Sequence, residues 1–492
     1  MNEESAAKLM DVSHLLSEIW VVIVVGLQTL AVVATTGHLV LSNRDVPSTV
    51  GWAGLVLLAP ILGVGLYWVF GINRIERKAH RLRPETSLQS EEASVRAEQR
   101  AHRILETRYP GLVALGHLGD ELTQSALDFG NRIRPLVNGD DAYPEMLAAI
   151  EQAERSIALS TYIFDHDAAG KQFIAALHRA QQRGVAVRVL IDGVGQRYSR
   201  PHTPKVLREL GIATGIFLES ALPIRNPYVN LRNHRKILVV DGRTGFTGGL
   251  NIREGCILSL DPPHPVQDLH FKIEGPAVRG LMDTFGLDWA FTTGERLGGE
   301  PWYPVLGPIG ETIARCVPDG PDEDFDVLRR LILGALAQAK RRVRIVTPYF
   351  LPDQALVTAL NVTAMSGVEV QILIPVRNNL RFVQWAAQAH AEDILEGHNR
   401  IFLTAPPFDH SKLMVIDDAW CFIGSANWDP RSLRLNFELN VECYDRDLVR
   451  QLDQLVEDKL SNAIEIDAGE MRSRILPVRL RDGFARLLTP YL

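Results

Sequence analysis

Two short motifs in this chain of 492 residues combine side chains that can act on phosphate esters. The first runs from His234 to Asn251 as HRKILVVDGRTGFTGGLN, and the second runs from His410 to Asn427 as HSKLMVIDDAWCFIGSAN. Both follow the pattern H-x-K-x4-D-x6-G-[GS]-x-N. A single H-x-K is common on strands, whereas two complete copies indicate a functional site.

The spacing of each motif predicts that its His and Lys share one face of a strand, where residues i and i+2 point the same way. Lysine and asparagine side chains that converge on one point can neutralise phosphate oxygens without a metal ion. One imidazole can then attack phosphorus to give a phosphohistidine, while the other donates a proton to the departing alkoxide. The predicted phosphate-binding residues are Lys236, Asn251, Lys412 and Asn427.

Carboxylates are expected to support this chemistry. The motif aspartates stand at the predicted strand ends, which favours a turn or positioning role for them. A further carboxylate should hold each His in the required tautomer, and Glu438 and Asp268 are the candidates, with Glu438 preferred. The candidate catalytic set is His234, Lys236, Asp241, His410, Lys412 and Asp417.

An internal duplication places these motifs in a predicted fold. STYIFD at residue 160 corresponds to VTPYFLPD at residue 346, and ALHRAQQRGVAVRVLIDG from residue 176 corresponds to ALNVTAMSGVEVQILIPV from residue 359. Each of the longer copies reads as a helix, a glycine and a strand rich in Val and Ile. The sequence therefore predicts an α/β fold with two pseudo-symmetric halves that form one active site between them.

The first seventy residues differ from the rest of the chain. Residues 19–41 and 50–72 are two runs without a charged side chain, and each is long enough to cross a bilayer as a helix. Together they predict a transmembrane hairpin with a kink at Pro60. Five basic residues follow the second run, so the N-terminus and everything beyond residue 72 are expected on the cytoplasmic side. These residues are Arg74, Arg77, Lys78, Arg81 and Arg83.

The predicted domains follow from these patterns. They are an N-terminal cytoplasmic segment 1–18, the hairpin 19–72, a basic and charged helical connector 73–128, and two halves at 129–308 and 309–492. The C-terminal stretch MRSRILPVRLRDGFARLLTPYL alternates arginine with apolar residues. This pattern is compatible with a helix on the membrane surface and equally with one docked on the catalytic domain.

Composition excludes several classes of protein. A formal net charge of −7 argues against a generally basic nucleic-acid binder. The four cysteines form no C-x-x-C pair, so neither a zinc site nor a disulfide framework is expected. We find no glycine-rich nucleotide loop and no acidic metal cluster, and we therefore expect no cofactor.

At these motifs the chain resembles the phospholipase D superfamily, and within it the bacterial cardiolipin synthases. The resemblance rests on both H-x-K motifs, on TPYFLPD, and on GSANWDPRSLRLNFELNVE after the second motif. It implies transfer of a phosphatidyl group between two phosphatidylglycerol molecules, with His234 as nucleophile and His410 as acid and base. It also implies phospholipid substrates and a multi-pass protein of the bacterial inner membrane.

The chain departs from the family pattern after the first motif. It reads NIREGCILSLDPPHP, with Arg253, Glu254 and Gly255 where the family predicts an acidic and aromatic continuation. We expect this segment to shape the acceptor side of the site. A hydrolytic phospholipase D, a transferase with another acceptor and a non-catalytic membrane scaffold are the alternatives, and the oligomeric state stays open.

Overall fold

The computed structural model describes residues 3–41, 46–70, 88–123, 125–219, 231–321, 326–487 and 489. These residues belong to two compact units, one made mainly of the first 74 residues and one that contains the remaining chain.

The N-terminal unit is helical. Helix α1 (Glu3–Leu41) includes one apolar stretch, 18–41, that is long enough to cross a membrane. The second predicted span forms two shorter helices, α2 (Val46–Leu58) and α3 (Pro60–Phe70). The rings of Trp52 and Tyr67 lie 5.6 Å apart, whereas a straight helix would separate these residues by about 22 Å. The predicted single second helix is therefore wrong: the chain folds back at Pro60.

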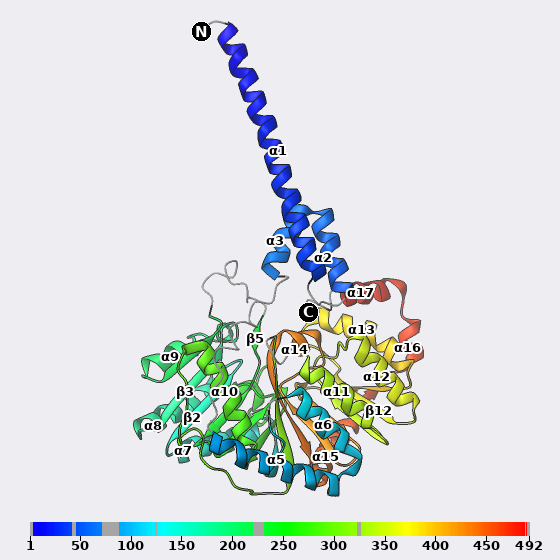
Figure 1. The fold of residues 1–492 in the computed structure, drawn as a ribbon. Coiled ribbons are helices and arrows are strands. Elements are labelled where there is room, and N and C mark those ends of the chain that lie inside the picture. The colour runs from blue at the N-terminus through cyan, green and yellow to red at the C-terminus, as the bar shows by residue number, and fades with distance from the viewer. Residues whose placement is uncertain are drawn as a thin grey trace. The chain divides into compact units, whose positions relative to one another are not determined.

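The larger unit confirms the predicted mixed α/β class. Its main sheet has 16 strands, ordered β18-β13-β12-β11-β15-β16-β17-β10-β1-β9-β7-β6-β2-β3-β4, and β5 pairs with β17 beside this path. The central pair β1 (Asp128–Val137) and β10 (Thr312–Asp319) is antiparallel. On either side of this pair the strands of the two predicted halves follow in corresponding order. Figure 1 shows β2 and β3 of the first half on one side of this unit and β12 of the second half on the other.

In the first half, the strands beyond β1 are β9 (Leu269–Glu274), β7 (Thr244–Gly248), β6 (Ile237–Val240), β2 (Ser156–Thr161), β3 (Ala186–Asp192) and β4 (Ala213–Phe217). In the second half they are β17 (Asn436–Tyr444), β16 (Trp420–Gly424), β15 (Leu413–Ile416), β11 (Arg342–Val346), β12 (Glu369–Pro375), β13 (Arg400–Thr404) and the edge strand β18 (Ile464–Glu465).

Two short strands cross between the halves. Strand β5 (Arg232–Asn233) of the first half pairs with β17 of the second, and β14 (Phe408–Asp409) of the second half pairs with β8 (Val266–Gln267) of the first. Each short strand directly precedes a motif histidine. The exchange therefore brings the two motifs to the same junction.

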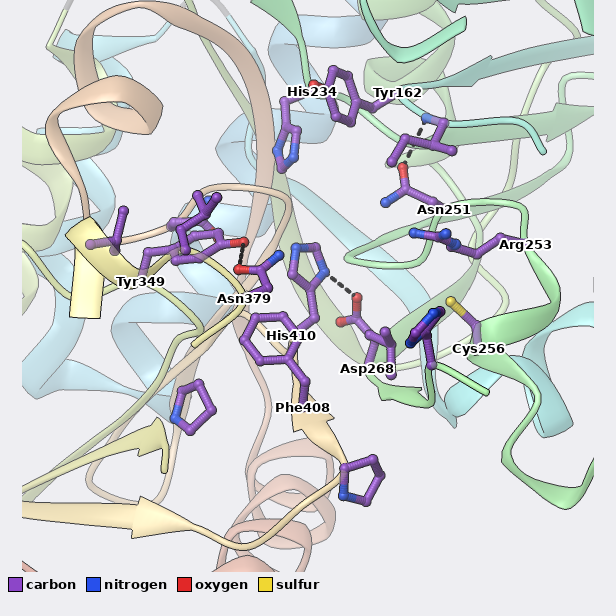
Figure 2. A pocket seen from close by; sticks show the side chains of 18 of the residues that line it. Tyr162, His234, Asn251, Arg253, Cys256, Asp268, Tyr349, Asn379, Phe408 and His410 are labelled. Atoms are coloured by element: carbon purple, nitrogen blue, oxygen red, sulfur yellow. Dashed lines mark hydrogen bonds and ion pairs between the residues drawn. The ribbon is translucent and has the colours of Figure 1, made fainter. Parts of the chain in front are cut away.

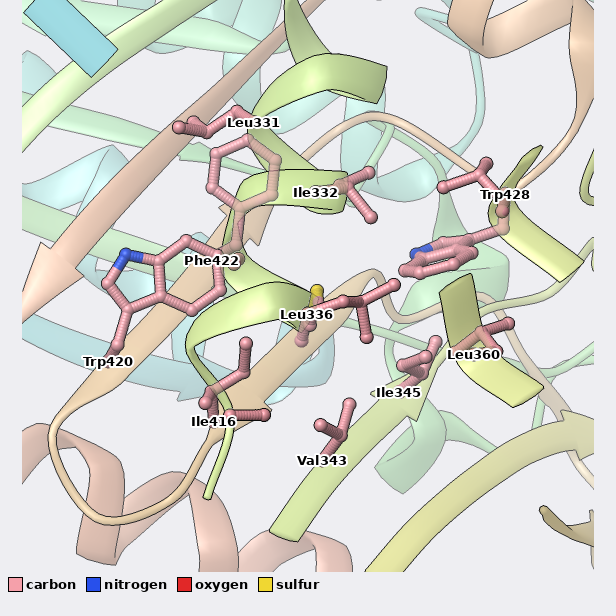
Figure 3. Close-up of a cluster of buried hydrophobic side chains, with 14 of the residues drawn as sticks. Leu331, Ile332, Leu336, Val343, Ile345, Leu360, Ile416, Trp420, Phe422 and Trp428 are labelled. Atoms are coloured by element: carbon pink, nitrogen blue, oxygen red, sulfur yellow. The ribbon is translucent and has the colours of Figure 1, made fainter. Parts of the chain in front are cut away.

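Helices cover the sheet and close two cores. In the first half, α7 (Asn138–Gln152) and α8 (Ala168–Gln182) pack in one core, and α10 (Val278–Thr293) contacts β2, β4, β6 and β7. In the second half, α11 (Val327–Gln338) and α12 (Gln354–Met365) pack over the sheet, and α15 (Arg446–Leu460) contacts β13, β15 and β16. Figure 3 shows part of the second core, including Trp420, Phe422 and Trp428.

The predicted connector is partly built into the second core. Its described part forms α5 (Leu88–Arg108) and α6 (Val113–Leu122), and Ala101 and Leu105 are fully buried there. Its basic cluster at residues 74–83 lies outside the described residues.

Candidate active site

The two motifs meet in a cavity of about 1000 Å³ at the junction of the halves. Its wall includes His234 and Asn251 from the first motif and His410 and Asn427 from the second. The two imidazole rings face one another with their centroids 6.5 Å apart and their planes at 73° (Figure 2). This is room for one tetrahedral phosphate between two ring nitrogens.

Neither histidine lies within a regular strand, contrary to the prediction. His234 to Lys236 form the link between β5 and β6, and His410 to Lys412 form the link between β14 and β15. The physical reason is the exchange of strands: β5 pairs with β17 whereas β6 pairs with β2, so the chain must cross from one ladder to the other. Within each link the Lys ammonium group donates to the carbonyl oxygen of its own histidine.

Each histidine is held by a carboxylate from the opposite half. His234 Nδ1 lies 3.1 Å from Glu438 Oε2, and His410 Nδ1 lies 2.7 Å from Asp268 Oδ2. An ionised carboxylate only accepts hydrogen bonds, so Nδ1 carries the proton in both rings. The Nε2 atoms are then left with a lone pair for attack or for proton transfer.

Glu438 is fully buried in strand β17 and is supported on both of its oxygens. The Ser425 hydroxyl donates to Oε2 at 2.6 Å, and Asn436 Nδ2 donates to Oε1 at 3.0 Å. Burial opposes ionisation, but contacts with His234, Lys236 and Ser425 outweigh it and keep the pKa of Glu438 below its ordinary value.

The corresponding position to Ser425 in the first half is Gly249. A Cβ atom there would lie 2.1 Å from Asp268 Oδ1, so the absence of a side chain leaves room for this carboxylate. The small residues at these two positions therefore accommodate or hold the carboxylates behind the histidines.

Burial dominates the acid–base properties of the site. It lowers the pKa of His234, against the pull of Glu438, and lowers the pKa of His410 well below its ordinary value, with further repulsion from Lys412 and Lys236. It also lowers the pKa of Lys236 to about 7 and that of Lys412 to about 8. The pKa of Asp268 changes in the opposite direction, because burial raises it to about 6.

The two motif asparagines are positioned by neighbouring backbone and side chains. Asn251 Oδ1 accepts from the backbone N–H of Ile163 at 3.0 Å, which directs its amide group toward the cavity (Figure 2). Asn427 Nδ2 donates to the Ser432 hydroxyl at 3.1 Å, and its Oδ1 atom is buried without a partner among the described residues.

The motif aspartates do not line this cavity, and their inclusion in the candidate catalytic set stays a prediction. Asp241 accepts hydrogen bonds from the backbone N–H groups of Glu154, Arg155 and Ser156 before β2. Asp417 accepts the equivalent bonds from residues 340–342 before β11. Both residues have a φ of 53°, and both close a turn, as their expected positioning role requires.

Sequence reasoning missed several residues that line the cavity. Tyr162 lies 5.1 Å from the His234 ring, and Tyr349 lies 6.4 Å from the His410 ring, each measured between ring centroids. Both tyrosines lie in the duplicated segments STYIFD and VTPYFLPD, so the duplication points to these segments. They are not at equivalent positions, because the matching bridges Phe164–Ile252 and Phe350–Trp428 align Tyr349 with Ile163. Arg253 also points into the cavity from the segment after the first motif (Figure 2).

A possible metal-ligand cluster lies elsewhere. Among the described residues, His102, His117 and Asp120 on α5 and α6 form the single group of this kind. None of these three residues lines the cavity.

Comparison with known proteins gives concordant matches. The family model described as "Cardiolipin synthase, PLD-like domain" matches residues 146–259 and 332–460. Cardiolipin synthase 1 of Bacillus anthracis is 33% identical over 95% of this chain and 93% of its own length. The cardiolipin synthase of Geobacillus kaustophilus is 32% identical over 92% of this chain and 90% of its own.

A solved structure shares the fold. The phosphatidylserine synthase of Haemophilus influenzae superposes with a TM-score of 0.57 over 77% of this chain and 100% of its own, at 15% identity. At this identity the likeness concerns the fold alone.

Proposed function

This chain belongs to the cardiolipin synthases of the phospholipase D superfamily, and from that premise we propose that it joins two phosphatidylglycerol molecules into cardiolipin and releases glycerol. The observation that carries the proposal is the pair of opposed imidazoles, each backed by a buried carboxylate from the other half. The two halves thereby contribute equally to one active site.

In the first step, Nε2 of His234 attacks the phosphorus of one phosphatidylglycerol. The bond from phosphorus to the glycerol oxygen breaks, and His410 gives its proton to the departing alkoxide. Burial keeps His410 neutral in the free enzyme. A bound phosphodiester adds negative charge that offsets Lys236 and Lys412, and so favours protonation of His410 when substrate is present.

In the second step, His410 removes the proton from a glycerol hydroxyl of the second phosphatidylglycerol. The resulting oxygen attacks phosphorus, and the bond to His234 breaks, which regenerates the free imidazole. Lys236, Lys412 and the two motif asparagines hold the phosphoryl oxygens in both steps. All charge neutralisation is thus assigned to side chains of the protein, and no cofactor is invoked.

We also propose the membrane arrangement. The apolar stretch of α1 supports membrane attachment. Since residues 46–70 fold back at Pro60 as two short helices, we assign the membrane crossing to α1. The basic residues after residue 72 favour the cytoplasmic face of a bacterial inner membrane for the catalytic halves 129–308 and 309–492. Labelling of cysteines introduced at Ser48 and Ser87 tests this topology. Access to both positions from the cytoplasmic face alone supports this arrangement, and access from opposite faces would contradict it.

The reaction is tested with purified protein and isotope-labelled phosphatidylglycerol in excess chelator. Mass spectrometry follows the lipids and released glycerol, with His234→Ala and His410→Ala alongside. Cardiolipin and glycerol from the wild type alone support the proposal. Phosphatidic acid as the main product would instead identify a hydrolase, and no turnover with any alcohol acceptor would favour a scaffold.

A further inference from the structure

The C-terminal helix α17 (Leu476–Leu487) has one face docked and one face open. At 100° per residue, Leu476, Leu480, Phe484 and Leu487 fall within an arc of about 80°. These four side chains are between 61% and 73% exposed. Asp482 and Ala485, on the opposite side, are buried. The sequence left surface binding and docking as alternatives, and this geometry is compatible with both at once.

The docked face is held firmly. Ala485 packs with Val383 and Ala386 of α13 (Arg381–Leu395) in a small hydrophobic cluster. Asp482 accepts hydrogen bonds from Arg474 at 2.7 Å and from Arg481 at 2.8 Å. The orientation of α17 on α13 is therefore fixed by this apolar cluster and by the ion pair between Arg486 and Asp393 of α13, which lie 3.2 Å apart.

The open face combines the features of an interfacial helix. Four large apolar side chains on one exposed stripe form a patch of the kind that marks a binding surface. Arg479 and Arg486 lie along one edge of this stripe. Arg479 is exposed there and adds positive charge, whereas Arg486 pairs with Asp393 of α13 at 3.2 Å. Basic residues beside an apolar stripe favour an anionic lipid surface over a neutral protein partner.

We propose that α17 lies flat in the anionic leaflet of the membrane, with Leu476, Leu480, Phe484 and Leu487 inserted among the acyl chains. The occupant of the open face is thus the lipid bilayer itself. This assignment does not depend on the reaction proposed above, since it concerns how the catalytic unit contacts the membrane surface.

The same cluster connects this surface to the active-site cavity. Tyr349, Leu351 and Val383 line the cavity and also belong to the cluster that holds Ala485. Leu380, just before α13, lines the cavity as well and is half exposed, as is Phe382. A lipid headgroup could therefore enter the cavity while its acyl chains stay in the leaflet beside α13 and α17.

The experiment uses the full chain with a single introduced cysteine. The four native cysteines are all buried, so an environment-sensitive thiol probe will report on the introduced position. Leu480→Cys places the probe on the open face of α17, and Gln451→Cys places it on the exposed side of α15 as a matched control. Both proteins are reconstituted in vesicles of phosphatidylglycerol and a zwitterionic lipid with brominated acyl chains.

The proposal predicts blue-shifted emission and strong quenching by the brominated chains at position 480, and neither effect at position 451. Water-like emission at position 480 would overturn it. A blue shift without quenching would also overturn it, because a second protein copy would then cover the stripe.

An activity comparison gives a second readout. Leu480→Asp with Phe484→Asp should lower turnover on vesicles about tenfold or more, because insertion of two large apolar side chains is lost. Turnover of a short-chain phosphatidylglycerol dispersed in detergent should stay unchanged. Equal losses on both substrates would indicate misfolding or a direct catalytic role, and would contradict a role of α17 in membrane binding.

Discussion

Replacing Glu438 by glutamine removes one negative charge from behind His234 and preserves the shape of the side chain. The carboxylate is fully buried and lies 3.1 Å from His234 Nδ1. When His234 becomes phosphorylated on Nε2 and keeps its Nδ1 proton, the ring gains a positive charge. Glu438 therefore stabilises the intermediate more strongly than it stabilises the free enzyme.

The size of the effect follows from this geometry. Two unit charges about 4 Å apart interact by about 4 kcal/mol at an effective dielectric constant of about 20. Since about 1.4 kcal/mol corresponds to a tenfold change in rate, Glu438→Gln should slow formation of the phosphohistidine about 1000-fold. The amide group would also favour the wrong histidine tautomer, as in other enzymes where a carboxylate orients a catalytic imidazole.

The assay is rapid quenching of the enzyme with labelled phosphatidylglycerol, followed by measurement of protein-bound label. Glu442→Gln is the matched control, because Glu442 is also fully buried in β17 but pairs with Arg315 at 3.0 Å, outside the cavity. It should affect the melting temperature and leave phosphohistidine formation within about threefold of wild type. A Glu438→Gln enzyme that keeps more than about a tenth of the wild-type rate would refute the electrostatic reasoning.

Three further predictions concern residues around this centre. Asp241→Asn should lower the free energy of unfolding by about 2 kcal/mol or more, because three backbone N–H groups lose a charged acceptor. It should leave kcat nearly unchanged. Chemical denaturation and turnover assays measure the two effects, and a selective loss of kcat would contradict the prediction. Arg253→Gln should raise KM for the acceptor phosphatidylglycerol about tenfold, because Arg253 lines the cavity while its Nε pairs with Asp165 at 3.2 Å. Steady-state kinetics and quenched-flow measurements test this together, and an equal loss in phosphohistidine formation would argue against an acceptor role. Finally, kcat/KM should rise with pH through about 6 as Asp268 ionises, and should fall between about 7 and about 8 as Lys236 and Lys412 lose their protons. A profile of kcat/KM that stays flat up to about pH 9 would contradict the requirement that Lys236 and Lys412 be protonated.

The duplication allowed the fold class and the contents of the site to be predicted from sequence. Two matching motifs at His234 and His410 required two similar α/β units, and the structure has strands in corresponding order around β1 and β10. The sequence also indicates the carboxylates Glu438 and Asp268. Their residue types and nearby positions in each half were sufficient to select them as candidates.

The pairing of each carboxylate with a histidine could not be predicted. Glu438 reaches His234, and Asp268 reaches His410, because β5 and β14 exchange between the halves. Such an exchange involves two-residue strands, which are too short to leave a periodic pattern. For the same reason the H-x-K residues were expected in strands, although they lie in the links between ladders.

The N-terminal region shows another limit of sequence patterns. Residues 50–72 are uniformly apolar, and this composition alone does not distinguish one long helix from two that fold back. Packing determines the difference: Tyr67 is buried against Leu39 and Val56, and its ring contacts that of Trp52. Hydropathy describes the solvent that a segment prefers and contains no information about such contacts.

The most direct test of the proposed mechanism is identification of the covalent intermediate. Wild-type enzyme would be quenched in acid-free denaturant during turnover of labelled phosphatidylglycerol, digested, and analysed by mass spectrometry for a phosphatidyl adduct. The mechanism predicts a single adduct on His234, which is absent from His234→Ala and accumulates in His410→Ala if any turnover remains. Cardiolipin formation without an adduct, or with an adduct on a residue other than His234, would contradict it.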